Sequence, residues 1–135
     1  MLRTYRGSCH CQSVRFEVRV DFSKGTVKCN CSFCSRLRFW LVQVRLEEFR
    51  LLSGESALSQ YQGKNPVARH PFCKRCGVHA FDRVDMPNGT GYPYINVNMM
   101  CLDELDLEEA LNAPVAYQNG LANDWSNPPP ESRHL

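Results

Sequence analysis

The sequence lacks a long hydrophobic run. Nowhere in its 135 residues do apolar side chains approach the roughly 18 consecutive positions of a membrane-spanning helix. Residues 1–9 also contain no apolar stretch that could form the core of a secretory signal peptide. These absences argue against a helical membrane protein, and we expect a location in the cytoplasm, where reducing conditions keep cysteines as thiols.

Charge of one sign is not in excess either. The 16 Lys and Arg residues nearly balance the 14 Asp and Glu residues, which gives a formal net charge of +2. Domains that bind nucleic acid through electrostatics usually carry a strongly basic face. We therefore expect no nucleic-acid partner and no membrane partner.

Long amphipathic helix patterns, internal repeats and a dividing linker are also missing. Instead, residues 14–20 and 94–99 alternate apolar and polar side chains, and residues 39–44 are rich in aromatic and β-branched ones, which is typical of strands. We expect a mostly β single domain over residues 1–125 with at most short helices. A poorly ordered, proline-rich tail is expected at 126–135.

Weaker signals predict the remaining elements. Extended segments are predicted at 26–28 and 78–81, one helical turn at 46–49, and a short helix within 102–111. Small and polar residues predict a turn at 21–25 and a loop at 86–91.

Cysteine, in contrast, is abundant, with 8 in the chain. Cys29, Cys31 and Cys34 have a C-x-C-x-x-C spacing, and neighbours this close do not pair easily, because a disulfide needs Cα atoms roughly 4.4–6.8 Å apart with a suitable dihedral angle. A metal ion accepts three neighbouring thiolates directly. Three protein ligands on zinc leave a fourth position open, which is the arrangement of a catalytic zinc site.

Four further cysteines form two pairs, Cys9 with Cys11 and Cys73 with Cys76. The C-x-x-C spacing of the second pair, followed by Gly77, is typical of a zinc knuckle. In the first pair, both side chains point to one face if the backbone is extended. The simplest assignment gives all four to a closed structural zinc site that joins the first strand to the middle of the chain.

Other arrangements of the cysteines are open at this stage. Cys73 and Cys76 could join part of the three-cysteine group, which would leave Cys9 and Cys11 for a weaker site. The 8 cysteines could form disulfides in a secreted protein, or Cys73 and Cys76 could be a thioredoxin-like redox pair, although no βαβ pattern surrounds them. Cys101 has no neighbouring cysteine and lies in an apolar stretch, which favours a buried, unreactive thiol.

Histidines and basic residues near the cysteines offer further ligands or charges. His10, His70 and His79 could each complete a metal shell or carry a proton, but we expect them to make structural hydrogen bonds, and we expect no role for His134. Basic side chains could compensate the charge of the thiolates or hold an anionic substrate. These are Lys28, Arg36, Arg38, Arg69, Lys74 and Arg75.

The cysteines belong to a wider pattern of motifs. It consists of Gly7-Ser-Cys-His-Cys11, Cys29-Asn-Cys-Ser-Phe-Cys34, Phe49-Arg-Leu-Leu-Ser-Gly54, Phe72-Cys-Lys-Arg-Cys-Gly-Val-His79 and Val97-Asn-Met-Met-Cys-Leu-Asp103. Over roughly residues 5–125 this pattern resembles the glutathione-dependent formaldehyde-activating enzyme (GFA) family, which includes the centromere protein V-like domains. The resemblance implies the zinc-binding β-tent fold of the Mss4-like superfamily. It also implies a structural zinc on Cys9, Cys11, Cys73 and Cys76 and a catalytic zinc on Cys29, Cys31 and Cys34.

The resemblance implies a function as well. We expect a zinc-dependent carbon–sulfur lyase or synthase, similar to S-(hydroxymethyl)glutathione synthase, that acts on glutathione or another small thiol and its formaldehyde adduct. The substrate thiolate would bind at the open zinc. Arg38, followed by Phe39 and Trp40, stands where family members commonly carry a small residue, often glycine. The alternative is a non-catalytic protein or RNA adaptor that zinc merely stabilises.

Overall fold

The computed structural model describes residues 1–85 and 91–135. The alternating segment near the N-terminus forms β2 (Arg15–Val20), which pairs antiparallel with β1 (Arg3–Ser8) and with β5 (Phe49–Ser53). Phe16, Val18 and Val20 are buried, so the alternation gives this three-stranded sheet one apolar face. The strand predicted at 14–20 is confirmed to within one residue.

A second, seven-stranded sheet has the strand order β10-β3-β4-β9-β8-β7-β6. Its strands are β3 (Thr26–Cys29), β4 (Trp40–Arg45), β6 (Leu58–Tyr61), β7 (Ala68–Cys73), β8 (Phe81–Val84), β9 (Tyr94–Asn98) and β10 (Val115–Gln118). All neighbours run antiparallel except β10 and β3, which are parallel. The strands predicted at 39–44 and 94–99 are β4 and β9, which pair with each other.

The helical segments are short. α1 (Cys34–Leu37) has 4 residues and α2 (Leu107–Asn112) has 6. The others in the described ranges are single 3-10 turns, η1 (Phe22–Lys24), η2 (Leu46–Glu48), η3 (Glu55–Ala57), η4 (Met99–Cys101) and η5 (Gly120–Ala122). In the part of the chain that the structure describes, no helix has the length and apolar character needed to span a membrane. The chain is therefore a mostly β single domain with only short helices, as predicted.

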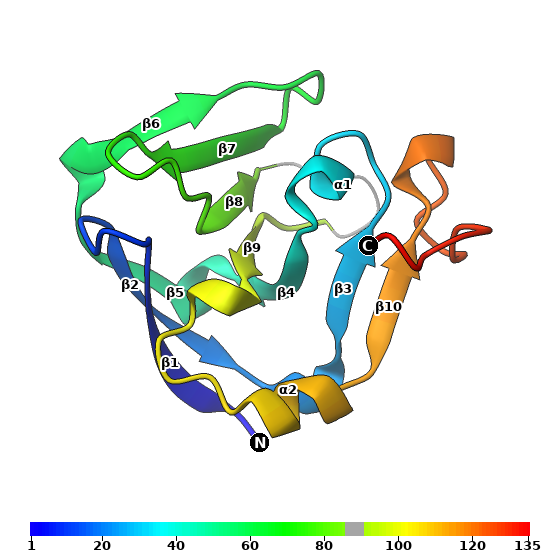
Figure 1. Cartoon of the computed structure of the whole chain (residues 1–135), viewed down its shortest axis with the longest axis horizontal. Coiled ribbons are helices and arrows are strands. Elements are labelled where there is room, and N and C mark those ends of the chain that lie inside the picture. Colours follow the sequence, from blue (N-terminus) through cyan, green and yellow to red (C-terminus); the bar gives the residue numbers. More distant parts are fainter. Residues whose placement is uncertain (86–90) are drawn as a thin grey trace.

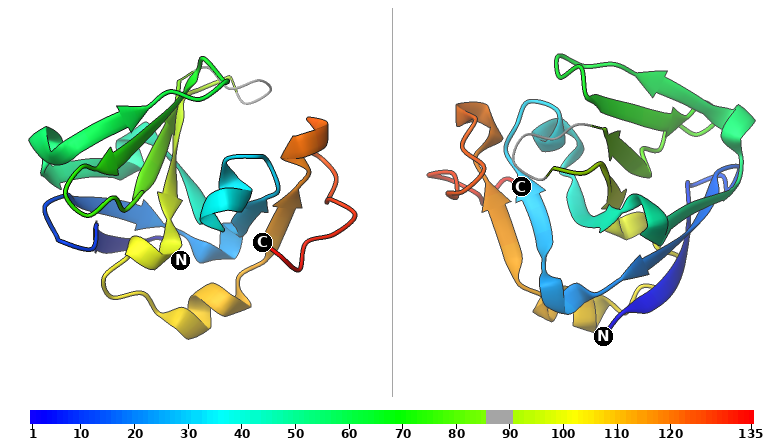
Figure 2. Two further views of the ribbon diagram at one scale, coloured as in Figure 1. Left: turned by 45° about the horizontal axis from the view of Figure 1, so that its top comes forward. Right: turned by 180° about the vertical axis from the view of Figure 1, so that it is seen from behind.

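The apolar faces of the two sheets share one core (Figure 1). Phe16 and Val18 of β2 belong to it together with Val42, Ile95 and Val97 of the larger sheet. Full burial of side chains of this size stabilises a fold by about 1.5–3 kcal/mol each. Figure 2 shows α2 at the end of the molecule where the N-terminus lies, with α1 at the other end of β3.

Three predicted segments differ from the structure. The extended backbone considered for Cys9 and Cys11 is not found, because the Gln12 N–H donates to the Cys9 carbonyl and Gln12 has a φ of 64°, which makes this segment a turn. The strand predicted at 78–81 is wrong for residues 78–80, since β8 begins at Phe81. The helix predicted within 102–111 begins only after Asp106, whose side chain caps it by accepting from the Glu109 N–H.

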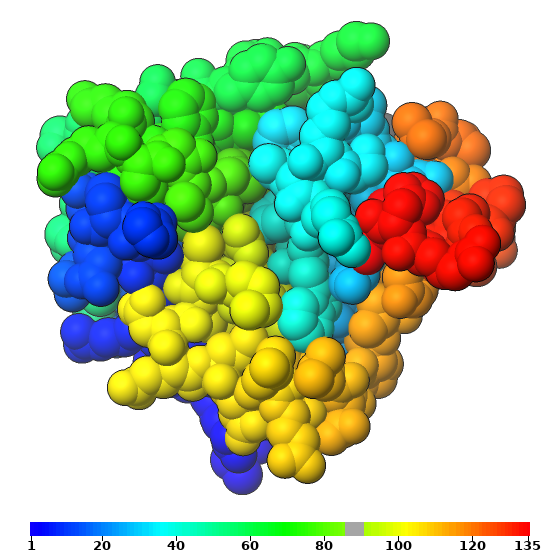
Figure 3. All heavy atoms as spheres, in the orientation of Figure 1, coloured from blue at the N-terminus to red at the C-terminus, as the bar shows by residue number. Residues whose placement is uncertain are grey.

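Two other predicted segments are a loop and the tail. Apart from Gly91, the loop predicted at 86–91 lies outside the described residues. Residues 126–135 pack against the segment that follows β3 (Figure 3), where Leu135 is buried and its carbonyl oxygen accepts from Lys28 Nζ at 3.4 Å. The domain boundary after residue 125 stays a prediction.

Candidate metal centres

Four sulfur atoms meet where the turn between β1 and β2 lies against the end of β7. Cys9 and Cys11 lie in the turn, Cys73 is the last residue of β7, and Cys76 follows shortly after. Cys11 Sγ is 3.7 Å from Cys9 Sγ and 3.6 Å from Cys73 Sγ. Sulfur atoms on a tetrahedral zinc ion with bonds of about 2.3 Å lie about 3.8 Å apart. This four-cysteine cluster therefore fits a closed zinc site.

Neighbouring groups hold the four-cysteine cluster in place. The Val14 N–H donates to Cys9 Sγ at 3.3 Å, and the Ser13 hydroxyl lies 3.2 Å from Cys11 Sγ. The contacts with Ser13 lower the pKa of the Cys11 thiol to about 6, whereas burial raises that of Cys9 to about 11. Gly54, with a φ of +90°, lets β5 end against this turn, because an added Cβ would lie 2.0 Å from the Ser13 carbonyl oxygen.

Three further sulfur atoms meet at the end of β3. Cys29 ends β3, Cys31 lies in the loop that follows, and Cys34 begins α1. Their sulfur atoms lie within 4.8 Å of one another. The Cys31 N–H donates to Cys29 Sγ and the Cys34 N–H to Cys31 Sγ, each at 3.3 Å. Because N–H donors favour the thiolate, which is the form that binds metal, this three-cysteine cluster is prepared for a cation.

The electrostatics of the three-cysteine cluster also point to a cation. Hydrogen bonds from Cys29 and then Cys34 lower the pKa of the Cys31 thiol. Contacts with Cys29 and Cys31, together with burial, raise the pKa of the Cys34 thiol. Without a cation, one thiolate at Cys31 is thus stabilised by its neighbours' protons, and three thiolates this close together require a positive ion. The all-sulfur donor set fits zinc.

A loop near the end of the chain forms one wall of the three-cysteine cluster. Asn30, which is 6% exposed, donates from Nδ2 to Asn119 Oδ1 at 2.9 Å and accepts from the Leu121 N–H at 3.1 Å. An added Cβ on Gly120 would lie 2.7 Å from Cys31 Cβ and 2.8 Å from Cys29 Sγ. The sequence analysis missed Asn30 and Gly120, because the contacts of Asn30 join residues 89 and 91 positions apart.

Replacing Gly120 by alanine is expected to displace the three-cysteine cluster. A Cβ contact below 3.0 Å forces either the loop or the cysteines to move. Loss of such support typically weakens metal binding about 10–100-fold. We expect this weakening at the three-cysteine cluster and not at the four-cysteine cluster. Competition with a chromophoric chelator measures it. Gly63→Ala is the matched control, since its Cβ would meet nothing closer than 3.6 Å. Unchanged affinity in Gly120→Ala would contradict the prediction.

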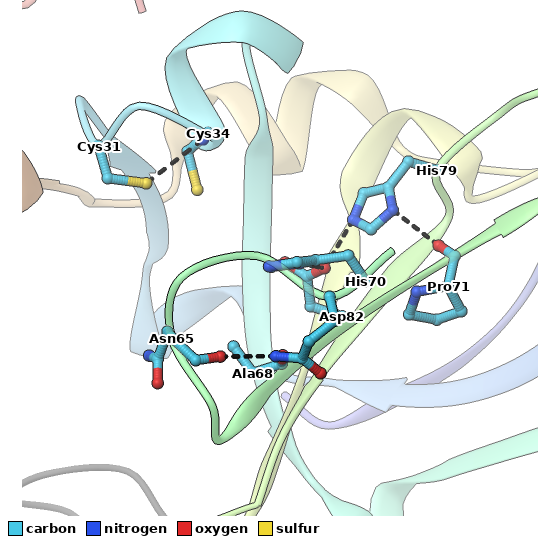
Figure 4. Close-up of polar contacts among 9 residues, drawn as sticks. Cys31, Cys34, Asn65, Ala68, His70, Pro71, His79 and Asp82 are labelled. Carbon is cyan, nitrogen blue, oxygen red and sulfur yellow. Dashed lines mark hydrogen bonds and ion pairs between the residues drawn. The ribbon is translucent and has the colours of Figure 1, made fainter. Parts of the chain in front are cut away.

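Aromatic rings and two histidines lie on another side of the three-cysteine cluster. Phe33, which lies between Cys31 and Cys34, stacks on His70 with ring centroids 3.8 Å apart. The Phe39 and His79 rings are 5.2 Å apart. The sequence places both histidines beside the C-x-x-C pair, but among the described residues neither joins the four-cysteine cluster. Figure 4 shows both histidines in one view with Cys31 and Cys34.

His70 and His79 form a third polar group with Asp82, which the sequence analysis did not identify. His70 Nδ1 and His79 Nε2 lie 2.7 Å and 2.8 Å from Asp82 Oδ1. Burial opposes the ionisation of Asp82, but its contacts with the two histidines lower its pKa. This is consistent with the hydrogen-bonding role expected for both histidines. His10 and His134 are exposed.

The predicted basic residues mostly bind other protein groups. Arg36 donates to the Ser32 carbonyl at 2.7 Å, and Arg69 pairs with Asp85 at 3.0 Å. Arg75 donates to Ser13 Oγ at 3.0 Å, and Ser13 in turn contacts Cys11 Sγ. Arg75 is thus placed to compensate charge at the four-cysteine cluster. Cys101 lies outside both cysteine clusters among the described residues, and burial raises its pKa to about 12, as expected for an unreactive thiol.

Arg38 ends α1 in a left-handed conformation, with φ 48° and ψ 53°. Side chains rarely adopt this conformation, which costs roughly 1–2 kcal/mol outside glycine. Arg38→Gly is therefore expected to raise the free energy of unfolding by up to about 1 kcal/mol, measured by urea denaturation. The matched control is Leu37→Gly, inside the helix, which should lower it by about 0.5–1 kcal/mol. A loss of stability in both variants would contradict the expectation.

The fold and the two clusters define a class, which is a cysteine-rich β domain able to hold one metal ion with four sulfur ligands and another with three. More particularly, the chain belongs to the GFA family. The family model described as glutathione-dependent formaldehyde-activating enzyme matches residues 4–117. This match confirms the resemblance and the Mss4-like fold that it implies.

A solved structure with this fold supports the assignment. The crystal structure of a Rhodobacter sphaeroides protein, a Northeast Structural Genomics target, is 28% identical to the chain with a TM-score of 0.67. The match covers 82% of this chain and 99% of that chain.

Proposed function

We propose that the chain is a zinc-dependent carbon–sulfur lyase or synthase that joins a small thiol, such as glutathione, to formaldehyde and cleaves the adduct. One observation carries the proposal. Among the described residues, no fourth Cys, His, Asp or Glu ligand atom lies within 4.8 Å of all three sulfur atoms of the three-cysteine cluster. Structural zinc sites have four protein ligands, whereas catalytic sites have three and an open position. The family description supports the thiol and the aldehyde.

The two clusters have different roles in this proposal. Cys9, Cys11, Cys73 and Cys76 hold a structural zinc ion. Cys29, Cys31 and Cys34 hold a catalytic zinc ion, which when bound stabilises a thiolate and orients it.

Neighbouring residues keep the catalytic cysteines in a fixed arrangement. Asn30 and Gly120 fix the loop so that the three sulfur atoms keep one orientation. The partly buried Phe33 and the half-exposed Trp125, which lies against Gly120, offer apolar surface to the carbon chain of a substrate.

The reaction forms or breaks one carbon–sulfur bond and transfers one proton. In the synthetic direction the thiol loses its proton, its sulfur forms a bond to the carbonyl carbon, and the carbonyl oxygen gains a proton. Cleavage reverses these steps. Synthesis consumes a free thiol and cleavage releases one. We therefore propose the cytoplasm, where thiols stay reduced, as the compartment.

Cobalt substitution tests the proposal. In protein loaded with Co²⁺ at the three-cysteine cluster, glutathione should change the thiolate-to-cobalt absorption, whereas S-methylglutathione, which has no thiol proton to lose, should not. Exchange spectroscopy by NMR should then show faster interconversion of free and hydroxymethylated glutathione than in buffer with formaldehyde alone. Two metal sites that do not respond to thiols, and no added exchange, would refute the enzyme and favour the adaptor.

A further inference from the structure

A single carboxylate oxygen is shared by two buried imidazoles beside the three-cysteine cluster. His70 on β7, His79 before β8 and Asp82 on β8 are 9%, 8% and 3% exposed. Asp82 Oδ1 lies 2.7 Å from His70 Nδ1 and 2.8 Å from His79 Nε2. The first contact is a hydrogen bond to a charged acceptor, whereas His79 Nε2 is buried without a hydrogen bond. Ligands on one zinc ion, with bonds of about 2.0–2.1 Å, would lie about 3.3 Å apart, so protons fit this group better than a metal ion.

The contacts of His79 fix the position of its ring beside the carboxylate. His79 Nδ1 donates to the Pro71 carbonyl oxygen, which can only accept, at 2.7 Å. His79 Nε2 lies 2.8 Å from Asp82 Oδ1 but is buried without a hydrogen bond. His79 therefore packs against Asp82 and limits where the carboxylate can lie.

The same carboxylate fixes the tautomer of His70. Because Asp82 accepts from His70 Nδ1, the lone pair of His70 is on Nε2. Among the described residues, His70 Nε2 has no hydrogen-bond partner. The side-chain atoms that are both fully buried and unpartnered do not include it, so His70 Nε2 reaches the surface. Gly63 leaves it uncovered, since an added Cβ there would lie 3.6 Å from Nε2. An aspartate that orients a histidine in this way prepares it to accept a proton.

Phe33 links this histidine to the three-cysteine cluster. Phe33, directly before Cys34, stacks on His70, and Figure 4 shows the ring in one view with Cys31 and Cys34. Burial raises the pKa of the Tyr94 hydroxyl, and the charges of Asp82, Cys34 and Cys29 raise it further. The Tyr61 ring on β6 also lies beside His70, with the two ring centroids 6.0 Å apart.

On the basis of the proposed function, we propose that His70 is the catalytic acid–base residue and that Asp82 and His79 are its positioning residues. In synthesis, His70 Nε2 takes the proton of the substrate thiol as the sulfur forms its bond to the carbonyl carbon. The electron pair of the C=O bond moves to oxygen, which receives the proton from His70. No oxidant or reductant is needed. General acid–base catalysis of this kind typically contributes about 10²–10⁴-fold.

His70→Gln tests the assignment against His134→Gln as the matched control. The first variant should lower kcat for thiol–formaldehyde exchange about 100-fold and flatten its dependence on pH, whereas the control should change neither. Both variants should keep two metal ions and the cobalt response to glutathione. Asp82→Asn should shift the pH profile and lower kcat while KM stays close to that of the wild type.

Nitrogen-15 NMR of the wild-type histidines gives a readout that needs no activity. We expect a proton on Nδ1 of His70 and none on its Nε2. A proton on Nε2 of His70 overturns the assignment. A metal content of three ions in the wild type that falls to two in His70→Gln also overturns the assignment.

Failure of this inference is distinguishable from failure of the proposed function. Wild-type exchange together with kcat within about threefold of wild type in His70→Gln overturns the role of His70 alone. Absence of exchange and of a cobalt response in the wild type overturns both.

Discussion

Replacing Cys73 by serine is expected to abolish cooperative folding of the chain near physiological temperature. Cys73 is 1% exposed at the end of β7, and its sulfur atom meets that of Cys11, which is 62 positions away. If the four-cysteine cluster holds zinc, its binding energy is folding energy, with apparent values of about 10–16 kcal/mol in zinc-finger peptides. The whole stability of a native domain is about 5–15 kcal/mol, so weakening this site removes much of it.

The place of the four-cysteine cluster explains why so large an effect is expected. It fastens the β1–β2 turn of the smaller sheet to β7 of the larger sheet, and the core lies between these sheets. Without the metal, burial of the apolar faces remains, but the buried Cys9 and the partly buried Cys11 and Cys76 lose their shared partner. The two sheets are then held by packing alone.

Thermal unfolding combined with metal analysis measures this effect. Cys101→Ser is the matched control, because Cys101 is also buried but lies outside the clusters among the described residues. The control should lose about 1–2 kcal/mol, or about 5 °C in Tm, and keep two metal ions. Cys73→Ser should lose one metal ion and the cooperative transition. A cooperative transition within about 5 °C of the wild type would show that the four-cysteine cluster is not a main source of stability.

The grouping of the cysteines could be predicted because its ligands come in short sequence motifs. Spacing alone puts Cys29, Cys31 and Cys34 within reach of one ion, and it puts Cys73 and Cys76 on one turn. The structure brings the other pair, Cys9 and Cys11, to the C-x-x-C turn and not to the three-cysteine cluster, so the alternative partition is wrong. The reason given for that pair was also wrong, since a turn and not strand alternation makes their sulfur atoms converge.

The surroundings of the three-cysteine cluster could not be predicted, because they depend on which strands become neighbours. Asn30 reaches the loop around Gly120 only because β10 lies parallel to β3, a pairing that joins Val115 to Thr26. His70 and Asp82 come together through the pairing of β7 with β8. No local sequence pattern indicates such long-range pairs. Alternation within a single strand is local, so the strands that show it could be predicted.

Replacing Cys34 by alanine is expected to reduce thiol–formaldehyde exchange to the rate in buffer while the fold is retained. The variant keeps the four-cysteine cluster and the core, because Cys34 is only partly buried and begins a helix of 4 residues. It leaves two sulfur ligands, which do not hold zinc against solvent and chelators as three do. The metal content should therefore fall from two ions to one, and Tm should stay within about 5 °C of the wild type.

Ser32→Ala is the control that separates loss of a ligand from disturbance of the loop. Ser32 is exposed and lies between Cys31 and Cys34. Its backbone carbonyl, which accepts from Arg36, is unaffected by the substitution. This control should keep two ions and full exchange. Full exchange in Cys34→Ala would contradict catalysis at the three-cysteine cluster. Loss of folding in Cys34→Ala, with the fold kept and one ion lost in Cys73→Ser, would instead mean that the structural and catalytic roles are exchanged between the two clusters.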